Sequence, residues 1–129
     1  MNDETKVWLQ YAEENFESAK VLLDSKLFNP CLQNIQQAIE KSLKAILIER
    51  SIRLKKTHSI LELKQIIEER NLFIVELSED DCDFLDSIYL PSKYPLMSVL
   101  PDFEPNENIC DKGIMLADKV LAQIKNILV

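Results

Sequence analysis

The sequence contains very little glycine: only Gly113 occurs among its 129 residues. Loops of the GxGxxG and GxxxxGK[ST] types hold phosphate only because several of their residues lack a Cβ atom. The sequence therefore excludes a dinucleotide-binding domain and a P-loop nucleotide hydrolase.

Cysteine and histidine are also scarce. The three cysteines, Cys31, Cys82 and Cys110, form no CxxC pair, and His58 is the single histidine. This pattern fits neither a disulfide framework nor a structural zinc site. We expect buried, reduced thiols, no metal and no other cofactor, as is typical of a cytoplasmic protein.

Long apolar runs are absent as well. No stretch approaches 18 apolar residues without charge, and no basic segment followed by an apolar one opens the chain, so the sequence predicts neither a membrane span nor a secretion signal. With 47% hydrophobic and 29% charged residues, the composition is that of a soluble globular protein. We expect one domain over residues 1–129.

The charge is unevenly distributed. The formal net charge is −7, which argues against indiscriminate binding to nucleic acid. Residues 41–56, however, hold six basic residues against one acidic residue, Glu49. This segment could attract phosphate, whereas the acidic run over residues 76–86 is typical of a solvated helix start.

Apolar residues recur every three or four positions over the first fifty residues of the chain. They predict one helix over residues 4–26 and a second from the Asn29-Pro30 start signal to about Arg50. Because two or three residues join them, these helices should form an antiparallel hairpin. The wide apolar face of the second helix predicts a central position in a bundle.

Three further helices follow. Ser59, or Thr57 two residues earlier, is expected to cap a third helix that ends near Arg70. Ser78 is expected to cap a short fourth helix that stops before Pro91. Residues 91–106 hold four prolines and are expected to form an extended loop, after which Asn106 caps the last helix. Gly113 would suit a close helix crossing there. Since no useful segment alternates with period two, we predict an all-α, antiparallel up-and-down bundle of about five helices.

Several segments resemble the HEPN family, named for higher eukaryotes and prokaryotes nucleotide-binding. The resemblance covers residues 5–125 and rests on QQAIEKSLKA at residues 36–45, Thr-His-Ser-Ile at residues 57–60 and Lys-Tyr-Pro at residues 93–95. It implies a helical bundle that is usually a homodimer. It also implies a toxin and antitoxin type pair with a separate minimal nucleotidyltransferase as protein partner.

The resemblance implies two possible activities. Many HEPN proteins are metal-independent ribonucleases with an Arg-x4-6-His motif, and others bind nucleotides without hydrolysis. Arg53 and His58 have this spacing, and both suit the chemistry: an imidazole can move the 2′-hydroxyl proton of RNA, and a permanent cation stabilises charge on phosphate. Alternatively, His58 packs locally or contacts a ligand without catalysis.

A polar stripe is predicted beside the apolar face of the second helix, with Gln33, Gln37, Lys41 and Lys44 at intervals of four, four and three residues. We interpret it as one wall of a nucleotide or RNA cleft that Lys93 and Tyr94 enter from the proline-rich segment. The free N–H groups of the helix start near His58 could add to an anion site. The alternative is that the lysines are solvated and the glutamines line a dimer seam.

Overall fold

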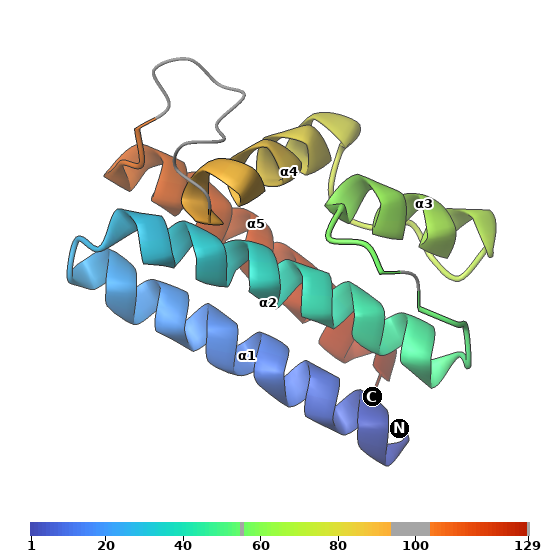
Figure 1. Ribbon diagram of the computed structural model, residues 1–129. Coiled ribbons are helices and arrows are strands. Elements are labelled where there is room, and N and C mark those ends of the chain that lie inside the picture. The colour runs from blue at the N-terminus through green and yellow to red at the C-terminus, as the bar shows by residue number, and fades with distance from the viewer. Residues whose placement is uncertain (55, 94–103, 129) are drawn as a thin grey trace.

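The computed structural model describes residues 1–54, 56–93 and 104–128, and none of these residues lies in a strand. The helices are α1 (Asp3–Asp24), α2 (Phe28–Glu49), α3 (Ile60–Glu69), α4 (Glu79–Lys93) and α5 (Glu107–Leu128). The first two run antiparallel, while α5 passes behind α2 and the shorter α3 and α4 cover another side of it (Figure 1). The predicted all-α helical bundle is confirmed.

Helix α2 lies at the centre of the bundle, in contact with each of the other four helices. Thirteen of its 22 residues are buried, against three in α1. Burial of this kind requires an apolar surface on more than one side of the helix, which is the pattern that its sequence carries. The polar groups of α2 therefore lie close to the core, and four of them are themselves buried: Gln36, Glu40, Ser42 and Lys44.

Gly113 marks the crossing of α5 over α2. A Cβ atom added there would lie 2.8 Å from Cδ1 and 3.1 Å from Cγ2 of Ile35, which is fully buried. Both distances are shorter than ordinary carbon contacts, so a side chain at this position would require Ile35 to move. The prediction of a close crossing is confirmed.

The first three helices end in the same way. Lys26, Ser51 and Asn71 have positive φ angles of 59°, 56° and 56° and stand immediately after the C-cap residue. At each end the two following amides bond back to the helix, for example Lys26 N to Leu23 O and Leu27 N to Leu22 O, both 2.9 Å apart. This is the Schellman pattern, which usually places glycine at the left-handed residue.

Local start signals identified three of the helices correctly. Ser59 Oγ accepts from Glu62 N at 3.1 Å, Ser78 Oγ accepts from Asp81 N at 3.0 Å, and Asn106 Oδ1 accepts from Ile109 N at 2.9 Å. Because each bond spans only three residues, the sequence already contains both partners.

The predicted start of α2 was wrong. The helix begins at Phe28 after an N-cap at Leu27, whose carbonyl accepts from Cys31 N, and no side chain caps it. The turn at Lys26 leads the chain directly into the helix, so Asn29 and Pro30 already belong to its first turn. Pro30 fits there because the first amides of a helix have no partner within it.

The predicted end of α4 was also wrong, since the helix passes through Pro91 to Lys93. Proline removes one backbone bond, but its fixed φ is itself helical, so the chain keeps its path for the final residues. The rest of the proposed loop lies largely outside the described residues. No described helix is long and apolar enough to cross a membrane.

Candidate functional site

The site is built around His58, which directly precedes the cap of α3. Its Nδ1 lies 3.0 Å from Oε1 of Glu40 in the middle of α2. The side chain of Glu40 is only 5% exposed, whereas that of His58 is 56% exposed. An imidazole at the surface is thus anchored on a carboxylate in the protein interior.

The other carboxylate oxygen of Glu40, Oε2, lies 2.9 Å from Nζ of Lys44. The side chain of Lys44 is 9% exposed. Burial alone raises the pKa of the Glu40 carboxyl, but hydrogen bonds from Lys44, Gln36 and His58 together outweigh it and hold the pKa below its usual value. Glu40 is therefore an ionised acceptor. The pair joins residues four apart on one helix, the spacing at which such ion pairs form.

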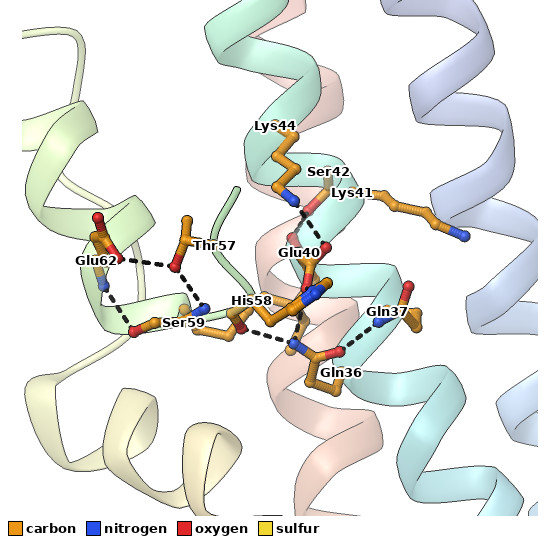
Figure 2. A network of polar contacts seen from close by, with 12 residues as sticks. Gln36, Gln37, Glu40, Lys41, Ser42, Lys44, Thr57, His58, Ser59 and Glu62 are labelled. Atoms are coloured by element: carbon orange, nitrogen blue, oxygen red, sulfur yellow. Dashed lines mark hydrogen bonds and ion pairs between the residues drawn. The ribbon is translucent and has the colours of Figure 1, made fainter. Parts of the chain in front are cut away.

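Gln36 holds His58 from a second side. Its Nε2 donates to Glu40 Oε1 at 3.1 Å and to the backbone oxygen of His58 at 2.9 Å, while its Oε1 accepts from Gln37 at 2.7 Å. Figure 2 shows these residues of α2 facing the turn that carries His58. Ring and backbone of the histidine are both fixed by neighbouring turns of one helix.

The backbone amides at the start of α3 donate hydrogen bonds to a side chain of the protein itself. Asp86 of α4 accepts from Ile60 N at 2.7 Å, from Ser59 Oγ at 2.9 Å and from Leu61 N at 3.3 Å. Carboxylates are favoured at helix N-termini for the same reason as phosphates. The anion site expected at this turn is therefore occupied by a side chain of the protein, and it helps to fix the backbone next to His58.

Arg53 lies in different surroundings. It is exposed and lines a surface depression with Asn2, Glu4 and Ile48, where the start of α1 meets the end of α2. Glu40, the anchor of His58, lies eight residues before Ile48, a distance of about 12 Å along the helix. The two predicted catalytic residues thus sit beside different parts of α2.

Lys41 points toward α1, away from His58 (Figure 2). Its Nζ donates to Asn15 Oδ1 at 2.8 Å and lies 5.9 Å from the centre of the exposed ring of Tyr11. The predicted polar stripe consequently divides in two: Lys44 pairs with Glu40, the carboxylate that holds the histidine, and Lys41 contacts Asn15 of α1.

The remaining predicted binding residues are only partly described. Lys93 is the last residue of α4, and Tyr94 lies outside the described residues. Within the described part of the chain, no group of three or more histidine, cysteine, aspartate and glutamate side chains could hold a metal ion.

Sequence reasoning missed the roles of Gln36, Glu40 and Asp86. The Gln-x3-Glu-x3-Lys spacing of Gln36, Glu40 and Lys44 places three polar groups on one helical face. That spacing could have indicated that Gln36, Glu40 and Lys44 act together, but not that they meet the start of α3. Asp86 gave no signal, because it stands in an acidic run that is otherwise solvated.

The helical bundle agrees with the comparisons with known proteins. The family model for the HEPN domain matches residues 5–127 of the sequence. The chain belongs to the HEPN family. This confirms the resemblance drawn from the sequence and accounts for the helical bundle.

Related proteins match this HEPN chain over nearly its whole length. It is 25% identical over 128 residues to the protein named "Putative toxin MJ0605" of Methanocaldococcus jannaschii, covering 99% of this chain and 94% of that protein. The crystal structure of TT1696 from Thermus thermophilus has a TM-score of 0.78 and 25% identity, covering 98% of this chain and 99% of the other. The crystal structure of ST0689, an archaeal HEPN homologue, has a TM-score of 0.70 and 26% identity, covering 95% of each chain.

Proposed function

We propose that this HEPN protein is one half of a toxin and antitoxin type pair whose other half is a separate minimal nucleotidyltransferase. Support comes from its membership of the HEPN family and its full-length similarity to a protein named as a putative toxin. We expect it to act in the cytoplasm. Its three cysteines are free and buried, as in proteins that keep reduced thiols.

The proposed activity is metal-independent cleavage of RNA. The observation that carries it is an imidazole anchored on a buried carboxylate yet more than half exposed. Such a group can accept the proton of a 2′-hydroxyl and is held in one orientation while it does so. The cation that would stabilise the phosphate in this reaction is Arg53.

A homodimer is part of this proposal. Within one chain Arg53 lines the depression beside Ile48, whereas His58 lies beside Glu40. A second copy of the chain would supply the Arg53 that acts with His58. We therefore expect Arg53→Ala to abolish cleavage without changing the helical circular dichroism, and Arg70→Ala, which alters another exposed arginine, to leave cleavage intact.

We propose that RNA or nucleotide phosphate is held by Gln37, Lys41, Lys44, Lys93 and Tyr94. The charge of Lys44 is already balanced by Glu40, so Lys41 should contribute more to phosphate binding. Lys41→Ala should lower the slope of log affinity against log salt concentration by about 0.7 for single-stranded RNA, as expected for one lost phosphate contact. Lys119→Ala, at an exposed position of α5, serves as the control.

The deciding experiment incubates the purified protein with single-stranded RNA in the presence of a chelator. We expect cleavage by the wild type and none by His58→Ala, with both proteins equally helical. Cleavage by His58→Ala at the wild-type rate would refute the role of this residue. Co-purification with the product of the adjoining reading frame tests the nucleotidyltransferase partner.

A non-catalytic module is the second candidate, favoured by the separation of Arg53 from His58 within one chain. It would bind nucleotides or a protein partner without turnover. Saturable, salt-sensitive nucleotide binding without RNA cleavage at any protein concentration would support this candidate against the first.

A further inference from the structure

The contact between Glu40 and His58 determines more than the position of the ring. A neutral imidazole carries its proton on one nitrogen only, and the two nitrogens then have opposite roles in hydrogen bonding. Which nitrogen carries the proton decides which one can take up another. Here Nδ1 faces the carboxylate oxygen at 3.0 Å.

An ionised carboxylate only accepts hydrogen bonds, so the nitrogen that faces it must be a donor. Glu40 is kept ionised by its buried pairing with Lys44, whose Nζ lies 2.9 Å from Oε2. Gln36 donates to the same Oε1 at 3.1 Å, which leaves that oxygen in the acceptor role. The lone pair of the imidazole must then be on Nε2.

We propose that Glu40 is a positioning residue that fixes His58 in the Nδ1–H tautomer and thereby makes Nε2 its proton-accepting nitrogen. The use of Nε2 on the 2′-hydroxyl of RNA rests on the proposed function. The tautomer itself does not, because it follows from contacts within the free protein.

Lys44 has a supporting role in this arrangement. Its ammonium group binds Oε2, the oxygen opposite the histidine, and so helps to hold the carboxylate plane with Oε1 directed at the ring. The two hydrogen bonds that Gln36 donates, to Glu40 and to the backbone oxygen of His58, tie the acceptor and the donor to one side chain. Together they restrict both partners of the 3.0 Å contact.

The tautomer can be read directly, because His58 is the only histidine of the chain. The experiment records imidazole ¹⁵N chemical shifts of protein labelled at histidine, at a pH at which the ring is neutral. Histidine in water favours the Nε2–H tautomer, so the expected signature is a reversal in the wild type. Glu40→Gln should move the chemical shifts back toward the values of free histidine, since an amide can either accept or donate.

Two variants keep the test decisive. Glu49→Gln makes the same change at the end of α2, where the carboxylate bonds to Asn2 and Thr5 instead, and should leave the tautomer unchanged. Glu40→Leu combined with Lys44→Met replaces the buried ion pair by apolar groups, which proteins often tolerate, and should restore the Nε2–H form if Glu40→Gln fails to fold. A wild-type ring in the Nε2–H form, or a tautomer unchanged when Glu40 is replaced, would overturn the proposal.

An RNA cleavage assay separates this inference from the proposed function. If both hold, Glu40→Gln lowers kcat by about 100-fold with little change in KM, since only the proton transfer is impaired. A wild type that has the Nδ1–H ring but cleaves no RNA refutes the ribonuclease and upholds the role of Glu40. A wild type that cleaves RNA with an Nε2–H ring refutes the role of Glu40 and upholds the ribonuclease.

Discussion

Replacement of Asp86 by alanine tests how the start of α3, and with it His58, is held in place. The carboxylate accepts from Ile60 N at 2.7 Å and from Ser59 Oγ at 2.9 Å, with a longer bond to Leu61 N. Each short bond to a charged acceptor contributes about 1.5 kcal/mol, so Asp86→Ala should lower the free energy of unfolding by about 3 kcal/mol. Asp86→Asn keeps one oxygen and should lose about half of that.

Urea unfolding followed by circular dichroism measures this loss. With an m-value of about 2 kcal/mol/M, the midpoint should fall by about 1.5 M for Asp86→Ala. Asp83→Ala is the matched control, because Asp83 is an exposed aspartate of the same helix and should change stability by less than about 0.5 kcal/mol. Equal midpoints for the two alanine variants would refute the view that Asp86 anchors α3.

Other predictions concern packing, turns, acid stability and thiols. Gly113→Ala should lower the free energy of unfolding by about 1 kcal/mol, because overpacking exceeds the gain in helix propensity. Adding Ile35→Val should recover part of this loss. Additive losses of the two substitutions in urea unfolding would contradict the close crossing. Lys26→Gly should raise the free energy of unfolding by about 0.5 to 1 kcal/mol, since glycine adopts its positive φ without strain, and an unchanged or lower value would count against this. The pKa of Glu40 is lowered in the folded protein, so the stability that this carboxylate contributes is present above about pH 4.3 and is lost as the pH falls through the folded pKa. The stability of Glu40→Gln should therefore decline less steeply with acid than that of the wild type. Parallel curves of stability against pH would contradict this. Burial raises the pKa of the Cys82 thiol to about 12, so a disulfide reagent should label it only in denaturant and not in the native protein at neutral pH.

The helical architecture could be predicted because its signals are local. The three- and four-residue spacing of apolar groups predicted the helices, and the bonds that start α3, α4 and α5 join residues three apart. The local signals failed where a second influence competed with them. Helix α2 begins before Asn29 because the left-handed turn at Lys26 leads directly into it. Helix α4 continues through Pro91 because the fixed φ of proline is itself helical.

The candidate site could be predicted only in part. His58 and Lys44 were identified from their residue types, and the pairing of Lys44 with Glu40 follows from helical spacing. It could not be foreseen that Arg53 lines a depression beside Ile48 while His58 contacts Glu40, since a spacing of five residues in a connector does not determine where either side chain lies. Lys41 likewise turned to Asn15 of α1, a residue 26 positions away.

By itself, the sequence determined the fold class, the number of helices and a small set of polar residues, because each of these depends on neighbours within a few positions. Only the tertiary structure decided which of those residues act together. Glu40 and His58 are 18 residues apart, and Ser59 and Asp86 are 27 apart. Contacts over such separations form only when the core brings the helices together, because the shared burial of α2, α3 and α4 offsets the entropy lost in ordering the chain between them.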